Sequence, residues 1–430
     1  MLILSKSGLK RELGLLEATA YGVGIILGAG IYALIGKAAG LAGPALWMSF
    51  FIGAIIASLT GLSYAELGTL FPKEAAEYTY AVKAFDSKRI AFLVGWLIII
   101  TATIGSAVVS LGFGGYFEAV TGVPQLWAAG ILIVGMSIMN YWGIKESAKM
   151  NIIFTLIELV GLILIILLAI PYMGSVDLME MPNGVGGVMA ASLLVFFAYI
   201  GFEDIVNVSE EMKNPVRTIP KALILSVAIT TIIYILVSIS AVSVLDWQIL
   251  GESTAPIADV ADAALPGSSF LFSLIALFAT GNTVLIFLIV ESRMVCGMAR
   301  DGSMPRWLGK IDKVRGTPIN AIAMIGGLTM LAIFWPIEVI AQATDLFAFT
   351  TFLFVNLALI FLRFKLPDFA REFKVPVNIG NFPVLAGIAV LANLYMITQF
   401  TYDLLAFGAF AIILGWVVYE IMLWKKWIVR

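Results

Sequence analysis

The 430-residue sequence contains no histidine and only one cysteine. Histidine is the commonest general base and a frequent zinc ligand, so His-dependent hydrolytic sites and a His-Glu-x-x-His metal site are excluded. The single cysteine, Cys296, excludes an intramolecular disulfide, and its apolar neighbours indicate a small core residue. We therefore predict that the chain is not an enzyme, and we expect neither a cofactor nor a metal centre.

Charged residues are also scarce, because Asp, Glu, Lys and Arg make up only 13% of the sequence while 61% is hydrophobic. Soluble domains carry about twice that charged fraction. The mean hydropathy is +1.02, and a water-soluble fold could not bury so much apolar surface. The lipid bilayer is therefore the expected solvent, and we expect no soluble domain and no nucleic-acid partner.

Long apolar runs separated by short polar connections account for most of the chain. A helix needs about 20 mostly apolar residues to cross the hydrocarbon core, and no stretch alternates as in a transmembrane β-barrel. The sequence predicts an all-α membrane protein with twelve spans, roughly at residues 13–38, 43–70, 89–117, 125–142, 149–172, 187–211, 219–245, 268–299, 318–335, 338–362, 382–401 and 404–424.

The basic residues predict the orientation of these spans. With the N-terminus inside, 25 of the 26 Lys and Arg residues lie in inner connections or near inner span ends, and only Lys37 lies outside. Cytoplasmic connections are enriched in Lys and Arg. We therefore predict a multi-pass protein of the plasma (inner) membrane with both termini in the cytoplasm.

The first predicted span carries four glycines in nine residues, from Gly22 to Gly30. Each glycine weakens a helix by about 1 kcal/mol relative to alanine. Gly24 and Gly28 could serve close helix packing, but we predict that the helix unwinds near Gly28–Gly30. Unwound backbone at membrane depth is tolerated only where it is buried in protein or lines a cavity.

The sixth predicted span has a matching irregularity, in which Gly201 lies among aromatic residues and is followed by Glu203 and Asp204. The two carboxylates could lie near the inner surface, or Glu203 could act in ion binding or gating, because charges at membrane depth are costly and usually functional. Interruptions in spans 1 and 6 are expected of paired broken helices in inverted repeats.

Backbone electrostatics then predict what the two breaks bind. Free N–H groups around Ala29–Ile31 favour an anion, and free carbonyls near Ala198–Ile200 favour a cation. An anion site facing a cation site suits a zwitterion such as an α-amino acid. Phe197, Tyr199 and Ile200 are predicted to shape the pocket for its side chain.

Several short motifs occur in order between about residue 9 and residue 376. They are Gly22–Tyr32 (GVGIILGAGIY), Ala42–Ala45 (AGPA), Ser63–Leu67 (SYAEL), Phe197–Glu203 (FAYIGFE), Glu210–Pro215 (EEMKNP), Met298–Gly302 (MARDG) with Pro305 and Thr317-Pro318, and Pro367 with Arg371–Pro376 (REFKVP). Together they resemble the amino acid–polyamine–organocation superfamily, and the sixth-span motif resembles its cationic amino acid transporter-like branch.

The resemblance implies a leucine-transporter-type fold, with two inverted five-helix repeats and two further helices. A single membrane domain would then cover residues 1–430, with repeats at 12–172 and 187–362 and extra helices at 382–424. It also implies amino acid uptake or exchange by alternating access. The substrate contacts that the resemblance implies are Ile26, Gly28, Ala29 and Gly30 in span 1, and Phe197, Ala198 and Ile200 in span 6.

Glu158 departs from the family pattern, because many proton-coupled relatives have a lysine at this place in the fifth span. A carboxyl buried among Leu156, Ile157 and Leu159 could load and release a proton near neutral pH. Alternatively, Glu158 could help to hold Na⁺ with span 1 carbonyls and with Asn282 and Thr283, or join helices as a protonated acid.

Two further acids have both structural and gating interpretations. Glu66 and Glu291 are predicted near inner span ends, where they could pair with Arg89, Arg293 or Arg300. The leading functional prediction is a proton-linked secondary transporter of amino acids. The alternatives are an exchanger of amino acids or polyamines, an ion channel, and a sensor that does not transport.

Overall fold

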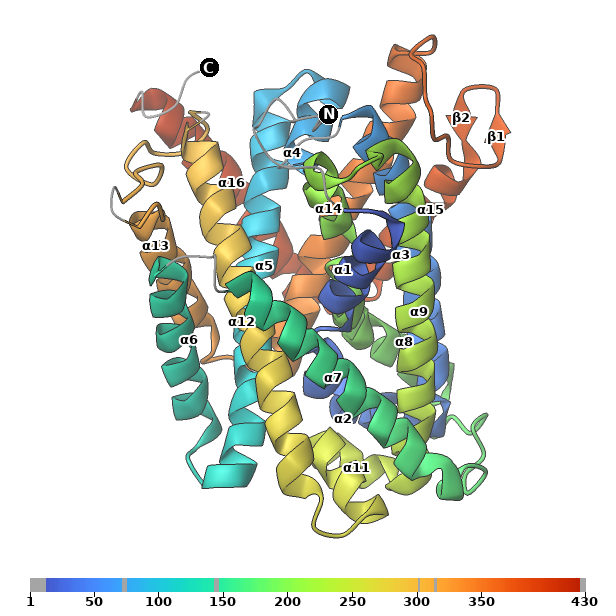
Figure 1. Cartoon of the computed structure of the whole chain (residues 1–430). Helices are drawn as coiled ribbons and strands as arrows, with labels where there is room; N and C mark the ends of the chain where they lie inside the picture. The colour runs from blue at the N-terminus through green and yellow to red at the C-terminus, as the bar shows by residue number, and fades with distance from the viewer. Residues whose placement is uncertain (1–12, 72–75, 143–146, 301, 313–314, 426–430) are drawn as a thin grey trace.

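The computed structural model describes residues 13–71, 76–142, 147–300, 302–312 and 315–425, most of which form helices packed side by side (Figure 1). The first half contains α1 Leu15–Leu27, α2 Gly30–Ala42, η1 Gly43–Ala45, α3 Leu46–Leu70, α4 Ala76–Phe85, α5 Lys88–Thr121, α6 Gln125–Trp142, α7 Ser147–Ala169 and η2 Ile170–Tyr172. The second half contains α8 Gly184–Val195, η3 Phe196–Tyr199, η4 Phe202–Glu211, α9 Pro215–Val244, α10 Trp247–Glu252, α11 Pro256–Ala264, α12 Ser269–Arg300, α13 Ile319–Ala332, α14 Ile337–Lys365, α15 Val384–Thr398 and α16 Tyr402–Trp424.

These helices follow the predicted apolar runs closely. Among the described residues, eight helical segments are long and apolar enough to cross a membrane, and α1, α13 and α15 are shorter apolar helices. Large apolar side chains are exposed along α6, α7, α13 and α16, as expected of surfaces that face lipid. The prediction of a multi-pass membrane protein is confirmed, whereas the arrangement of twelve spans in inverted repeats stays a prediction.

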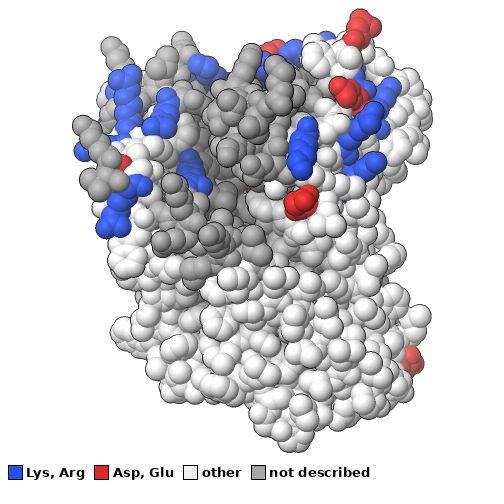
Figure 2. Space-filling model, viewed as in Figure 1, with Lys and Arg blue, Asp and Glu red and all other residues white. Residues whose placement is uncertain are grey.

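Figure 2 shows Lys and Arg gathered at one end of the molecule, above a nearly uncharged surface. This distribution is the one that the sequence predicts for the cytoplasmic side. Lys37, the exception in the sequence, forms an ion pair with Glu338 at 3.1 Å that joins α2 to α14. The terminal residues 1–12 and 426–430 lie outside the described residues, so their predicted cytoplasmic location stays a prediction.

The polar connections contain more regular structure than the sequence suggested. Helix α4 follows α3 at the end where Lys and Arg gather (Figures 1 and 2). The connection at 246–268 forms two short helices, α10 and α11. A small antiparallel hairpin, β1 (Asn378–Ile379) and β2 (Phe382–Pro383), precedes α15.

Glu66 organises a buried ion-pair network near this same end. Its carboxylate lies 2.6 Å from Arg363 Nη2 and 3.0 Å from Arg371 Nε, and it accepts the backbone N–H of Val375 at 2.7 Å. Arg371 also donates to the carbonyls of Leu362 and Leu366 at the end of α14. The network therefore fastens the segment after α14 onto α3.

The expected partners of Glu66 and Glu291 were wrong. Arg89 instead pairs with Glu420 on α16 at 3.0 Å, with both side chains largely exposed. The carboxylate of Glu291 accepts hydrogen bonds from Thr103 and Ser106 on α5. Proximity in the sequence did not identify the partners of Glu66 and Glu291, because these partners come from helices that are distant in the sequence.

Candidate functional site

The first span is broken where the sequence predicted. Helix α1 ends at Leu27, Gly28 and Ala29 form a turn that belongs to neither helix, and α2 begins at Gly30. A Cβ on Gly30 would lie 2.6 Å from the Cα of Ala198, which belongs to η3. The two predicted breaks are therefore in direct backbone contact, and only glycine fits at this point.

The sixth span is broken as well. The α-helical hydrogen bonding of α8 ends at Val195, and the chain continues as two 3₁₀ segments, η3 and η4, that meet at Gly201. Gly201 has φ +113°, a conformation that side chains disfavour. A Cβ there would also lie 2.5 Å from the Ile25 side chain of α1. Both the backbone conformation and the steric contact with span 1 therefore require glycine at position 201.

Tyr234 of α9 links the two breaks, and no pattern in the sequence predicted this contact. Its hydroxyl lies 2.5 Å from the carbonyl oxygen of Ile26, 3.0 Å from that of Leu27 and 2.9 Å from that of Ala198. The carbonyls that we expected to face a cation therefore meet a hydroxyl. Since a tyrosine hydroxyl carries one proton, it can donate to only one of the three at a time.

Part of the predicted anion site is already hydrogen-bonded. The backbone N–H of Ala29 donates to Thr283 Oγ1 of α12 at 3.1 Å, and Thr283 in turn donates to the carbonyl of Ala279. Thr283, predicted as an ion or gate residue, therefore contacts the break in span 1. Its neighbour Asn282 is buried in the same helix.

A cavity of about 680 Å³, counting its opening toward solvent, lies beside the breaks. Phe197 and Ile200, two of the predicted pocket residues, line it together with Glu203, and their contact with a substrate stays a prediction. The remaining lining residues come from α3, α4, α5, α12, α14 and η4, and they are Tyr64, Glu77, Ile98, Thr101, Ala102, Gly105, Asp204, Phe287, Val290, Met294, Thr344, Ala348, Thr351 and Phe352. The space inside it that is open to a water-sized molecule is about 70 Å³, well below the roughly 300–1,000 Å³ of small-molecule sites, so the cavity is narrow in this conformation.

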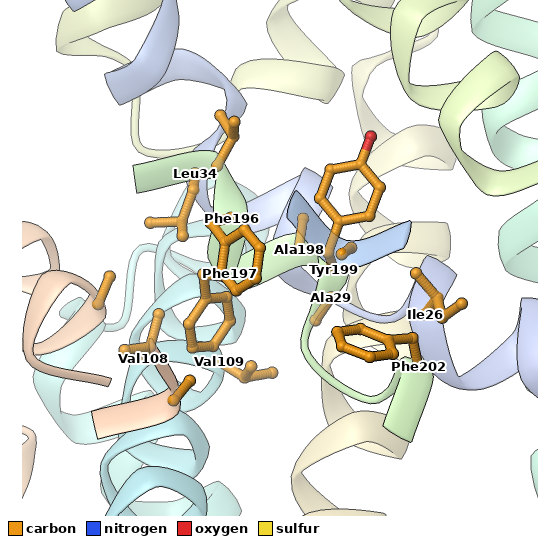
Figure 3. Close-up of a cluster of buried hydrophobic side chains, with 14 of the residues drawn as sticks. Ile26, Ala29, Leu34, Val108, Val109, Phe196, Phe197, Ala198, Tyr199 and Phe202 are labelled. Carbon is orange, nitrogen blue, oxygen red and sulfur yellow. The ribbon is translucent and has the colours of Figure 1, made fainter. Parts of the chain in front are cut away.

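Other predicted contacts do not line this cavity. The Tyr199 side chain turns away from Phe197 (Figure 3) and donates to the carbonyl of Phe50, so it supports the fold around the break. The remaining predicted contacts that are buried outside the lining are Ile26, Gly28, Ala29, Gly30 and Ala198. In this conformation the pocket wall is formed by span 6 and its neighbours, without span 1.

The comparisons with known proteins agree with this architecture. The amino acid permease family model matches residues 13–419. The chain belongs to the amino acid permease family. This family lies in the amino acid–polyamine–organocation superfamily, so the resemblance read from the motifs is confirmed.

The relatives of this family member carry several different names. It is 31% identical to the branched-chain amino acid permease BcaP of Bacillus subtilis, over 97% of this chain and 95% of that protein. It is 29% identical to the vacuolar cationic amino acid transporter 4 of Arabidopsis thaliana, over 84% of this chain and 64% of that protein. It is also 29% identical to the methylthioribose transporter of Bacillus subtilis, over 86% and 85% of the two chains. The names of these three relatives are those of transporters rather than of enzymes.

Glu158, the predicted coupling residue, is buried in α7 with 1% of its surface exposed. Its Oε1 atom has no hydrogen-bond partner among the described residues, while its backbone carbonyl accepts the hydroxyl of Tyr32 on α2. Helix α7 packs closely on span 1, since a Cβ on Gly24 would lie 2.8 Å from Thr155. Glu158 therefore lies in the helix that supports the first break in this family member.

Acidic groups line the part of the cavity that reaches α4 in this family member. Glu203 accepts the backbone N–H of Gly201 at 2.9 Å, and Glu77 of α4 is 4% exposed with an Oε2 atom that has no described partner. Burial, with a smaller contribution from nearby Asp204, raises the pKa of Glu77 to about 7. The lining of the cavity is thus apolar near the breaks and acidic toward α4.

The raised pKa of Glu77 predicts a pH-dependent cost to stability. Below about pH 4.5 the carboxyl is protonated in both folded and unfolded chains, and between 4.5 and 7 only the unfolded chain ionises, so folding stability falls as the pH rises. We expect the free energy of unfolding of E77Q, relative to that of the wild type, to rise by about 2 kcal/mol between pH 5 and pH 8. Denaturation of purified protein at both pH values measures this, and a constant difference between the two proteins would contradict it.

Proposed function

We propose that this chain is a secondary transporter that carries amino acids across the plasma (inner) membrane by alternating access. The observation that supports this most directly is the contact between two broken helices, Gly30 against Ala198, beside a narrow cavity that Phe197 and Ile200 line. Backbone groups at helix breaks can bind a charged solute without charged side chains. Alternating access would move one broken helix relative to the other around this point.

The substrate would bind as a zwitterion at the breaks. Its carboxylate would face the N-terminus of α2 at Gly30–Tyr32, and its ammonium would replace the Tyr234 hydroxyl at one of the carbonyls of Leu27 or Ala198. Its side chain would enter the cavity at Phe197, Ile200 and Phe287. This apolar wall favours aliphatic side chains, in line with the name of the Bacillus subtilis branched-chain relative.

The proposed coupling ion is a proton carried by Glu158. A buried carboxyl without a partner at Oε1 is stable only when it is neutral or when a cation compensates it. Sodium held by Glu158 with Thr283 and Asn282 is the alternative, and exchange of one amino acid for another is the alternative to net uptake. The cavity reaches Glu77 on α4 at the Lys- and Arg-rich end, so we propose that this conformation opens to the cytoplasm.

The test combines binding and transport. Purified wild type and E158Q are screened for thermal stabilisation by the twenty amino acids at two pH values, and hits are followed as labelled solutes in proteoliposomes. We expect aliphatic amino acids to stabilise both proteins, and E158Q to lose the pH dependence of uptake. Uptake that requires amino acid inside the vesicle would identify an exchanger. No binding or movement of any amino acid or amine would exclude the proposed function.

A further inference from the structure

Asp345 of α14 is a fully buried acid that the sequence analysis did not single out. None of its surface is exposed, and neither carboxylate oxygen has a hydrogen-bond partner among the described residues. Its neighbours in the helix, Thr344 and Ala348, line the cavity. Such a group is rare, because buried polar atoms are almost always hydrogen-bonded.

The side of α14 that carries Asp345 faces the break in span 6. Phe349, one helical turn along, packs on Phe196 of η3 with ring centroids 4.3 Å apart. The backbone amide of Phe197 faces the Asp345 carboxyl without completing a hydrogen bond. A small movement of η3 would therefore make or break this contact.

No ion pair compensates Asp345 within the described residues. The ion pairs that involve α14 lie near its two ends, and they are Lys37 with Glu338, Glu66 with Arg363, and Asp86 with Lys365. Glu77 of α4, which also packs on α14, is a second buried acid with an Oε2 atom that has no described partner, so it supplies no counter-charge. Tyr199, the titratable side chain of η3, points its hydroxyl to the carbonyl of Phe50. An ionised carboxylate in this position would lose its hydration without gaining a partner, which costs several kcal/mol.

Asp345 has a counterpart in Glu158. Each acid lies in a helix that packs on one break, Glu158 in α7 against span 1 and Asp345 in α14 against η3. In the predicted inverted repeat these helices are spans 5 and 10, the last helices of the two halves. Counted from the first residues of their helices, Ser147 and Ile337, Glu158 is the twelfth residue and Asp345 the ninth, so their positions differ by about one helical turn.

We propose that Asp345 is a second proton-binding site, which holds a proton in the conformation seen here and exchanges it when the span 6 break moves. The inference rests on the proposed function, since it assigns one proton-binding acid to each broken helix. The proton would come from water admitted on one side and leave to water on the other, so only an O–H bond forms and breaks. Asp345 acts on η3, and it does not touch the substrate.

The first test detects the proton directly. Wild type and D345N, both containing ¹³C-labelled aspartate, are compared by infrared spectroscopy at neutral pH. We expect the carbonyl band of a protonated, label-shifted aspartic acid in the wild type and its loss in D345N. D345E, which keeps an acid, should remove the band from the aspartate label while restoring an unlabelled acid band. Absence of the band in the wild type, or its persistence in D345N, would overturn the proposal.

The second test measures transport. A step that requires one proton changes rate up to about tenfold per pH unit in its titration range. We expect wild-type uptake driven by a pH gradient to show such a slope, D345N to lose it while still binding amino acid, and D345E to recover it. An unchanged slope in D345N would refute the coupling role. If the wild type moves no amino acid at all, the proposed function fails, and the infrared comparison still decides whether Asp345 holds a proton.

Discussion

Replacing Glu66 by glutamine should destabilise the folded protein by about 3–5 kcal/mol, because it leaves two buried guanidinium groups without their counter-charge. Arg363 is 2% and Arg371 6% exposed in their side chains, and Glu66 is fully buried. The same carboxylate also accepts the Val375 backbone N–H. Denaturation of detergent-purified E66Q should show this loss as a much lower midpoint than the wild type.

The matched control is E420Q, which removes the same charge from another Glu–Arg pair. Glu420 and Arg89 are 40% and 51% exposed, and exposed pairs contribute only about 0–1 kcal/mol. We expect E420Q to unfold close to the wild type. Equal losses in the two variants would mean that burial of the Glu66 network does not determine its contribution. Proteolysis of the segment between α14 and β1 in E66Q but not in E420Q would show that this segment is the part that loses stability.

Replacing Gly30 by alanine should abolish transport and lower stability by about 3 kcal/mol. The added Cβ would lie 2.6 Å from the backbone Cα of Ala198, so relief requires moving one broken helix away from the other. Overpacking against mobile side chains usually costs about 1–3 kcal/mol, and backbone yields less than a side chain. Uptake into proteoliposomes and denaturation of the same preparation measure both effects.

G327A is the control for this change. Gly327 lies in α13 and a Cβ there meets nothing within 4 Å, so alanine should be neutral or stabilising by up to about 1 kcal/mol. Transport by G327A should match the wild type. If G30A retained wild-type uptake, close contact between the two breaks would not be required for function.

The sequence predicted the breaks well because their cause is local. Glycine density in Gly22–Gly30 and the glycine among aromatics at Gly201 weaken helices wherever they occur. The apolar runs predicted the helices for the same reason. Helix α4 was missed because its ten residues mix polar and apolar side chains and lie between two spans. Length and hydropathy do not reveal such a helix.

The rest of the site depends on contacts between distant parts of the chain. Tyr234 lies 207 residues from Leu27, and no pattern in α9 marks its hydroxyl as the partner of span 1 carbonyls. Asp345 was missed for a different reason. A lone acid in a long apolar run is visible in the sequence, but its lack of partners appears only in the packed structure. Tyr199 was predicted to lie in the pocket because it is next to the break in span 6. The sequence does not show in which direction a 3₁₀ segment points a side chain.

The hydroxyl of Tyr234 has a consequence for motion. Rotation about its C–O bond redirects a single hydrogen among three oxygen acceptors, two from span 1 and one from span 6. The hydroxyl can thus hold one broken helix while the other is free to move. We expect this shared hydrogen-bond donor to let spans 1 and 6 move relative to each other while α9 stays bonded to one of them.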